Sequence, residues 1–189
     1  MEESAERAPR EGSGGTDLAW LKDFVRDVPD FPNPGVGFKD ITPLLADPRA
    51  FSACIEALAE SFSGADIDKV IGVEARGFIV AAPVAQALSA GLVPVRKPGK
   101  LPWAVHRETY QLEYSTDVLE IHTDALRPGE RVLIIDDVLA TGGTASATAR
   151  LAARLGGNVI GFGCIIELAF LNGRSKLGEL PIVALLSYD

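Results

Sequence analysis

Cysteine, histidine and long apolar runs are scarce in this sequence. The 189 residues include two cysteines and two histidines. Cys54 and Cys164 both stand among apolar neighbours, which favours two buried thiols in a reducing cytoplasm over a disulfide framework or a zinc site. No stretch is long and apolar enough to cross a bilayer, and the N-terminal residues lack the apolar core of a signal peptide. We therefore expect a cytoplasmic protein without a membrane partner.

Positive charge is also in short supply. The sequence has 18 Lys and Arg against 26 Asp and Glu, a net charge of −8. A protein that binds nucleic acid normally presents a basic face, so this balance argues against a nucleic-acid partner while leaving room for a local basic pocket. Residues 1–15 are rich in Glu, Ser and Gly and lack apolar periodicity. They predict a disordered N-terminal tail, and residues 16–189 are expected to form a single domain.

The rest of the sequence alternates helix-like and strand-like patterns. Apolar residues at helical spacing predict helices in residues 18–28, 49–62, 78–90 and 144–156. Short aliphatic or alternating runs predict strands in residues 69–73, 92–95, 117–122, 131–136, 158–168 and 181–187. Proline and glycine predict an extended loop over 29–45, and a polar stretch with little core-facing character predicts a functional loop over 98–116.

This order of elements predicts an α/β fold with a doubly wound, mostly parallel sheet and helices on both of its faces. Continuous aliphatic strands are typical of a sheet that is covered on both sides, and right-handed crossovers place the helices there. Ligands of such sheets bind at the carboxyl ends of the strands. We therefore look for the site at the ends of residues 69–73 and 131–136.

The stretch RVLIIDDVLATGGT, residues 131–144, carries the strongest signal for function. Its aliphatic strand leads to Asp136 and Asp137 at the predicted carboxyl end. A turn of small and hydroxyl residues then enters a helix, and free amides at a helix N-terminus, with glycines that permit close approach, bind phosphate well. The residues of this turn are Ala140, Thr141, Gly142, Gly143 and Thr144.

The two adjacent aspartates restrict the class of ligand that this turn would bind. Carboxylates beside a phosphate cradle repel a triphosphate, but they accept hydrogen bonds from ribose hydroxyls and attract Mg²⁺ carried by neighbouring phosphates. A 5-phosphorylated sugar therefore fits, with its phosphate in the turn and its 2- and 3-hydroxyls on Asp136 and Asp137. The alternative is an acidic strand end followed by an ordinary glycine turn.

Two further groups are candidates for binding a polyanion. Arg76, which follows Glu74 and Ala75 at the end of the first core strand, has the fork geometry that clamps phosphates, and a surface arginine is the alternative interpretation. A basic cluster follows the strand at 92–95, and a solvated charged face is its alternative interpretation. The cluster consists of Arg96, Lys97 and Lys100.

Residues 131–144 resemble the signature of type I phosphoribosyltransferases, which bind 5-phosphoribosyl 1-pyrophosphate. Further segments resemble the adenine branch of that family in the same order and at similar spacing, and the match covers nearly everything from about residue 20 onward. These segments are FPNPGVGFKDITPLL, GVEARGF, RKPGKLP, ETYQLEYSTDVLEIHTDAL and IIELAFLNGRSKL.

The resemblance implies roles for the loops around the sheet. It implies a pyrophosphate subsite formed by Glu74, Ala75, Arg76, Arg96, Lys97 and Lys100, and a homodimer in which part of the basic cluster serves the neighbouring subunit. It implies an N-terminal hood over about 28–45 and a flexible catalytic lid over about 98–116. The catalytic residues that it implies are Glu113 for proton exchange with the base, Tyr114, Arg76 and Lys100. Glu108 is a second lid carboxylate, and the choice between it and Glu113 stays open.

The resemblance also implies that the hood holds adenine. Phe38 would stack on the ring, the main chains of Gly37 and Lys39 would read its edge, and Val138 would line its underside. From the residues alone, a lone aromatic in a loop is more often a packing anchor. Gly37 departs from family members that carry a side chain there, which would loosen the hood without removing a backbone contact.

The reaction that these assignments imply is transfer of the 5-phosphoribosyl group from 5-phosphoribosyl 1-pyrophosphate to N9 of adenine, giving AMP and pyrophosphate in purine salvage. Mg²⁺ is the expected cofactor, bound chiefly by substrate oxygens and water, with Asp136 and Asp137 reaching it at most indirectly. The alternatives are transfer to another base (hypoxanthine, xanthine or orotate) and, in a different class, a ligand-sensing regulator on the same fold.

Overall fold

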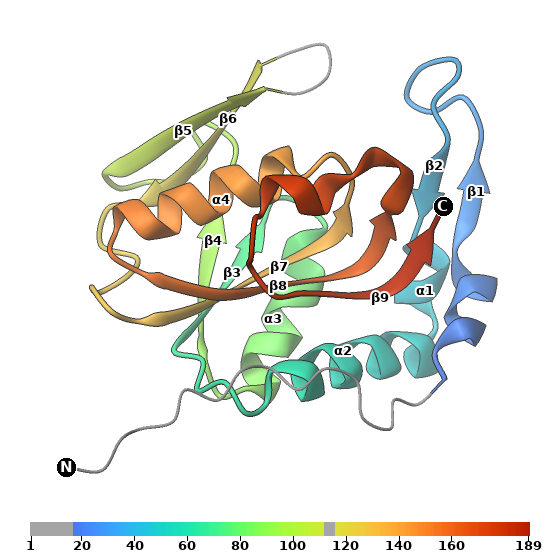
Figure 1. Cartoon of the computed structure of the whole chain (residues 1–189), viewed down its shortest axis with the longest axis horizontal. Helices are drawn as coiled ribbons and strands as arrows, with labels where there is room; N and C mark the ends of the chain where they lie inside the picture. The colour runs from blue at the N-terminus through green and yellow to red at the C-terminus, as the bar shows by residue number, and fades with distance from the viewer. Residues whose placement is uncertain (1–16, 112–115) are drawn as a thin grey trace.

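The computed structural model describes residues 17–111 and 116–189 (Figure 1). The tail predicted over residues 1–15 lies outside them. Within the described residues, no helix combines the length and the apolar character that crossing a bilayer requires.

A parallel sheet of five strands forms the centre of the molecule. Its spatial order is β4-β3-β7-β8-β9, and every neighbouring pair is parallel. The aliphatic runs that predicted the three central strands, β3, β7 and β8, are buried along most of their length, as a sheet covered on both faces requires. The bounds are β3 (Lys69–Val73), β4 (Gly91–Val95), β7 (Arg131–Leu139), β8 (Asn158–Leu168) and β9 (Ile182–Tyr188).

Helices cover the two faces of this sheet (Figure 1). Helices α2 (Pro48–Phe62) and α3 (Gly77–Ala87) pack on one face, against Leu133 and Ile135 of β7. Helix α4 (Gly143–Arg154) packs on the other face, against Val132 and Ile134 of the same strand. Because successive residues of a strand point to opposite faces, the continuous aliphatic run of β7 supplies both cores. The predicted fold class is confirmed.

The strand order creates a crevice where β3 and β7 lie side by side. From β3 the chain passes through α3 to β4 on one side, and from β7 it passes through α4 to β8 on the other. The loops that follow β3 and β7 therefore diverge and leave room between them for a ligand. Strand β7 runs on to Leu139, so Asp136 and Asp137 lie within the strand, which ends three residues later than predicted.

The N-terminal segment differs from its prediction. The helix predicted over 18–28 is wrong in its second half: a 3₁₀-helix, η1 (Ala19–Phe24), is followed by a strand, β1 (Arg26–Val28). The loop predicted over 29–45 contains a strand, β2 (Phe38–Asp40), and a short helix, α1 (Thr42–Ala46). Strands β1 and β2 pair antiparallel, and cross-strand ion pairs of Arg26 with Asp40 and of Asp27 with Lys39 reinforce the pairing.

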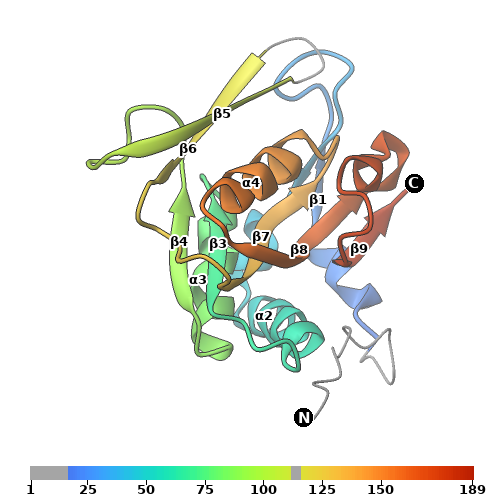
Figure 2. The same cartoon turned by 60° about the vertical axis from the view of Figure 1, so that its left-hand side comes forward.

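The segment 98–116 is likewise more regular than predicted. It contains β5 (Val105–Gln111), which pairs antiparallel with β6 (Thr116–His122) as a hairpin. The hairpin packs against α4 because Tyr110, Leu119 and Ile121 are buried there, so the segment does contribute to the core. In Figure 2 the hairpin and the segment between β1 and β2 project on the same side of the molecule, beyond the ends of the parallel strands.

Candidate active site

A cavity of about 910 Å³ opens at the crevice between β3 and β7. It collects residues from most of the segments that the sequence singled out: Gly37, Phe38, Lys39, Glu74, Ala75, Arg76, Lys97, Asp136, Asp137, Val138, Ala140 and Thr144. These residues are up to 107 positions apart in sequence, from 37 to 144. The parallel sheet brings those that follow β3 and β4 or lie along and after β7 to one edge, and the antiparallel β1–β2 pair adds Gly37, Phe38 and Lys39. A cavity of this size accommodates a ligand as large as a nucleotide.

The two adjacent aspartates lie on the cavity wall with different surroundings. Asp137 is 7% exposed, and its Oδ2 accepts a hydrogen bond from Nε of Arg76 at 2.5 Å. Asp136 turns to the other side, toward the start of α3, and its Oδ1 accepts from the Asp137 amide at 2.9 Å. A Cβ on Gly77 would lie 2.7 Å from that Oδ1, so only glycine lets α3 begin this close to the acid.

The pKa of Asp136 lies well above its ordinary value of 3.8. Burial of the carboxyl is the main cause, and the nearby charge of Asp137 adds to it. Both effects penalise the charged form, and the hydrogen bond from the Asp137 amide only partly offsets them. Asp136 therefore takes up a proton more readily than a solvent-exposed aspartate.

The predicted phosphate turn has the geometry of a helix N-terminal cradle. Gly142 has φ +74°, a left-handed conformation that suits glycine, and α4 begins at Gly143. Ala140 and Thr144 line the cavity, whereas Thr141, Gly142 and Gly143 are not among its lining residues. The turn thus meets the cavity at its two ends, and the backbone of Thr141, Gly142 and Gly143 connects them at the start of α4.

A second glycine supports the turn from behind. A Cβ on Gly142 would lie 2.3 Å from the carbonyl oxygen of Gly173, and a Cβ on Gly173 would lie 2.2 Å from the carbonyl oxygen of Ala140. Arg174 fixes this backbone contact, because its Nε and Nη2 each donate to a carboxylate oxygen of Glu167 at 2.7 Å. The sequence does not predict a functional role for this segment, because the contact joins glycines that are 31 positions apart, from 142 to 173.

The predicted pyrophosphate residues divide into two groups. Glu74, Ala75, Arg76 and Lys97 line the cavity, whereas Arg96 and Lys100 do not appear in its lining. Both of these cations pair with Glu74, which also accepts a hydrogen bond from the Lys97 amide at 2.9 Å. Burial raises the pKa of Glu74, but the hydrogen bonds from Lys100, the Lys97 amide and Arg96 outweigh it, and the net pKa is lowered. Glu74 therefore organises the basic cluster.

The predicted adenine residues lie together on one wall. Phe38 is half-buried, meets the edge of the Phe31 ring at a centroid distance of 5.1 Å, and has the guanidinium carbon of Arg76 4.9 Å from its centroid. Nζ of Lys39 pairs with Asp27 and lies 4.1 Å from the ring centroid of Tyr188, and all three residues line the cavity.

The predicted lid acids are placed unequally. Glu113 and Tyr114 lie outside the described residues, so their catalytic roles remain predictions. Glu108 lies on β5 and accepts a hydrogen bond from Nε of Arg150 on α4 at 2.6 Å, and it is not among the lining residues of the cavity.

The C-terminal part of the chain adds a wall that the sequence analysis missed. It consists of Leu168, Phe170, Leu171, Tyr188 and Asp189. These residues follow β8 and end β9, so the parallel sheet carries them to the same edge as the acids. Except for Asp189, these residues are apolar or aromatic, which in the sequence indicates core, and only their position at or after the strand ends indicates the cavity. Phe170 is 63% exposed, so its side chain is available for contact with a flat apolar ligand.

The doubly wound sheet, the acid pair within β7 and the glycine turn that enters α4 define a type I phosphoribosyltransferase. The family described as "Phosphoribosyl transferase domain" matches residues 40–179 of this chain. The chain therefore belongs to the phosphoribosyltransferases, and its similarity to individual proteins places it in the adenine branch of that family.

A curated adenine phosphoribosyltransferase from Myxococcus xanthus (strain DK1622) is 56% identical over 171 residues, 90% of this chain and 93% of the relative. The crystal structure of adenine phosphoribosyltransferase from Rhodothermus marinus DSM 4252 is 53% identical, with a TM-score of 0.87 over 91% of this chain and 98% of that one. The Saccharomyces cerevisiae enzyme, solved with an imino-altritol bisphosphate and adenine, is 40% identical, with a TM-score of 0.84 over 89% of this chain and 98% of that one.

The raised pKa of Asp136 yields a prediction for stability. The folded protein holds this proton more tightly than the unfolded chain, so the wild type loses stability as pH rises from about 3.8 through the raised value. Asn cannot titrate, and it still accepts from the Asp137 amide. Asp136→Asn should therefore be more stable than wild type at pH 8, with the difference shrinking toward pH 4. Urea unfolding at both pH values measures this, and an equal difference at the two would contradict it.

The contact between the two glycines yields a prediction for substrate binding. Gly173→Ala would push the new Cβ into the Ala140 carbonyl oxygen, which lies 2.2 Å away, and so displace the phosphate turn. We expect the Michaelis constant for 5-phosphoribosyl 1-pyrophosphate to rise by about ten-fold or more, equivalent to about 1.4 kcal/mol. Gly64→Ala is the control, because nothing lies within 4 Å of its added Cβ. A Gly173→Ala enzyme with unchanged steady-state kinetics would show that the support is dispensable.

Proposed function

We propose that this cavity transfers the 5-phosphoribosyl group from 5-phosphoribosyl 1-pyrophosphate to N9 of adenine, releasing pyrophosphate and AMP. The observation that carries the proposal is the convergence of four predicted groups on one cavity: the hood, the loop after β3, the acid pair and the glycine turn. The relatives and solved structures named adenine phosphoribosyltransferase support it, and one of those structures was complexed with adenine and a bisphosphate.

The sugar phosphate is placed at the β7 end of the cavity. Its 5-phosphate occupies the turn between Ala140 and Thr144, where the amides at the start of α4 donate to it. Its 2- and 3-hydroxyls donate to Asp136 and Asp137, and for this Arg76 must give up its bond to Asp137. With both ends of the sugar held, the reaction gains from positioning of the sugar carbon against the base.

The leaving group is placed at the β3 end. The loop Glu74–Arg76 and Lys97 line this part of the cavity, and their donors face the pyrophosphate as negative charge builds on it. Arg96 and Lys100, which pair with Glu74, hold the loop in register and are available to a neighbouring subunit. We infer that the chain forms a homodimer, which would supply this neighbouring subunit, from the resemblance to the family. We also infer a cytoplasmic location.

Adenine is placed under the hood. Phe38 stacks on the ring, the main chains of Gly37 and Lys39 pair with its polar edge, and Val138 contacts it from below. Proton exchange with the base is assigned to Glu113 and assisted by Tyr114. The described position of Glu108, paired with Arg150 outside the cavity, supports this choice between the two acids.

The residues at the cavity fit a magnesium ion that arrives with the substrate. Asp136 and Asp137 are carboxylate ligands of the kind that Mg²⁺ accepts. Within residues 17–111 and 116–189, no cluster of three or more acidic, histidine or cysteine ligands could hold a metal by protein groups alone. This donor set suits an ion held chiefly by pyrophosphate oxygens and water, with the acids reaching it at most through water. When bound, the ion would neutralise charge on the departing pyrophosphate.

Assays with a panel of bases test the proposed function. The purified chain is given 5-phosphoribosyl 1-pyrophosphate with adenine, hypoxanthine, xanthine or orotate, and nucleotide and pyrophosphate are measured. We expect adenine to be preferred over each of the other bases by at least about a hundred-fold in kcat/KM, since an edge read by hydrogen bonds discriminates strongly. Preference for an oxopurine or for orotate would overturn the assignment of the base.

The hood assignment predicts a selective defect. Phe38→Ala removes the ring proposed to stack on adenine and leaves the phosphate turn untouched. The Michaelis constant for adenine should rise by about ten-fold, because stacking on an aromatic ring is worth about 1–3 kcal/mol per base. The constant for 5-phosphoribosyl 1-pyrophosphate should change less. Phe31→Ala serves as a comparison, because it removes the edge contact on Phe38 and leaves the Phe38 ring in place. Equal increases for both substrates in Phe38→Ala would refute the stacking role.

A further inference from the structure

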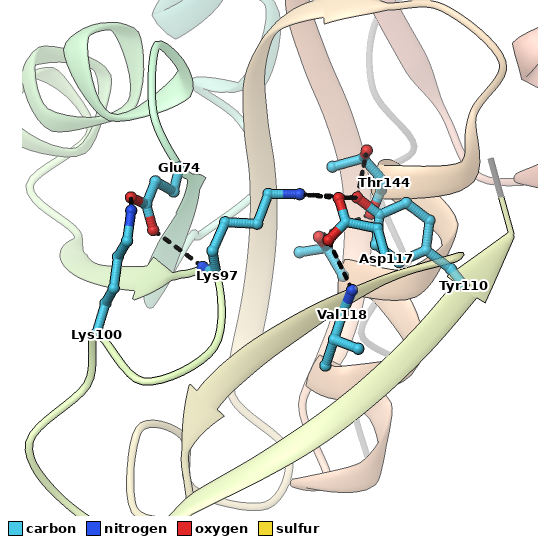
Figure 3. A network of polar contacts seen from close by, with 8 residues as sticks. Glu74, Lys97, Lys100, Tyr110, Asp117, Val118 and Thr144 are labelled. Carbon is cyan, nitrogen blue, oxygen red and sulfur yellow. Dashed lines mark hydrogen bonds and ion pairs between the residues drawn. The ribbon is translucent and has the colours of Figure 1, made fainter. Parts of the chain in front are cut away.

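Lys97 lines the cavity and belongs to a network of polar contacts that the sequence does not predict (Figure 3). Its ammonium group donates to Oδ2 of Asp117 and to the hydroxyl of Tyr110, the latter at 3.3 Å. Its backbone amide donates to Glu74 at 2.9 Å. Lys97 is thus held at both ends, by the loop after β3 at its backbone and by the hairpin at its charged tip.

The Tyr110 hydroxyl is the centre of the network. It accepts hydrogen bonds from Lys97 and from Oγ1 of Thr144, each at 3.3 Å, and it donates to Oδ2 of Asp117 at 3.1 Å. Both lone pairs and the proton are therefore used. The ring itself is 5% exposed, so the hydroxyl is fixed in place by packing. Figure 3 shows these side chains meeting between the hairpin and α4.

Asp117 is held as firmly as Tyr110. The two residues face each other across the β5–β6 hairpin in the strand register. Oδ1 of Asp117 accepts from the Val118 amide at 2.8 Å, which leaves Oδ2 for Lys97 and Tyr110. Burial lowers the pKa of Lys97 and raises that of Asp117, but their mutual hydrogen bond reverses both effects. The pair stays ionised, so the cavity keeps a positive charge at a defined place.

The network joins the two ends of the proposed substrate. Lys97 lies in the pyrophosphate subsite, and Thr144 lies in the 5-phosphate turn at the start of α4. Tyr110 contacts both side chains directly. Among the described residues, Arg150 and Glu108 form another link between the hairpin and α4, but that pair lies outside the cavity.

We propose that Asp117 and Tyr110 are positioning residues, which hold the Lys97 ammonium at the pyrophosphate subsite and tie it to Thr144 of the 5-phosphate turn. This inference rests on the proposed function and deepens it. The turn end of the hairpin, where Tyr110 pairs with Asp117, thereby sets the separation of the two anion subsites, so that one molecule of 5-phosphoribosyl 1-pyrophosphate spans them in a single pose. Neither residue needs to touch the reacting atoms for this purpose.

Steady-state kinetics of conservative variants test the proposal. Asp117→Asn keeps the shape of the side chain and removes its charge, and Tyr110→Phe removes the hydroxyl while the buried ring stays. Each should raise the Michaelis constant for 5-phosphoribosyl 1-pyrophosphate by about five- to ten-fold, with the constant for adenine within about two-fold of wild type. Lys97→Ala should do the same, and adding Asp117→Asn to it should have no further effect, because residues in one network are not additive.

Arg150→Gln is the matched control. It breaks one link between the hairpin and α4 outside the cavity and should leave both Michaelis constants unchanged. Thermal unfolding of each variant separates loss of fold from loss of positioning. Should Asp117→Asn fail to fold, Tyr110→Phe decides the matter alone. Equal effects on both substrates, or effects of Lys97→Ala and Asp117→Asn that multiply, would overturn the proposal.

The test also separates this inference from the proposed function. A wild-type chain that makes AMP while the network variants keep normal kinetics would refute the positioning role and leave the function intact. A wild-type chain without turnover would refute the function. In that case, calorimetric titration of magnesium pyrophosphate into wild type and Asp117→Asn still decides on positioning. Weaker binding of magnesium pyrophosphate by Asp117→Asn than by wild type supports the positioning role, and equal binding contradicts it.

Discussion

Parallel pairing of β3 with β7 is the constraint on which the site depends. The register sets Lys69 beside Val132 and Gly72 beside Ile135, so the two strands deliver their following residues to the same edge at the same height. One loop carries Arg76, and the other strand carries Asp136 and Asp137. The small size of Gly77 then allows α3 to start against Asp136. A shift of this register by two residues would separate the cation from the acids and abolish the cavity between them.

The parts of the fold that the sequence predicted correctly are those where one local force dominates. Aliphatic runs such as 131–136 can only be buried, and the order of strands and helices then restricts the sheet to few topologies. Arg76 and Asp137 also meet as expected, because the parallel strands β3 and β7 bring their carboxyl-terminal parts to the same edge of the sheet. Phe38 reaches the cavity from the antiparallel β1–β2 pair instead. The predicted roles of these residues in binding derive from family resemblance, and the geometry is compatible with them.

The errors arose where long-range pairing overrides local signals. Proline and glycine around Phe38 concealed a strand because its partner, Arg26–Val28, was itself assigned to a helix. The polar stretch before Gln111 concealed half of a hairpin, since only alternate residues such as Tyr110 face the core. The support of the phosphate turn by Gly173 had no local signature at all. Contacts of this kind become visible only when the sheet brings distant segments together.

Arg76 borders two proposed binding places, and this position couples the binding free energies of the two substrates. Its guanidinium binds Asp137 on one side and lies over the Phe38 ring on the other, so a single cation borders the places assigned to sugar and base. A ligand that draws this cation away from one neighbour must change the free energy of binding at the other. By linkage the change is reciprocal: whichever substrate enters first alters the affinity for the second by the same factor that the second exerts on the first.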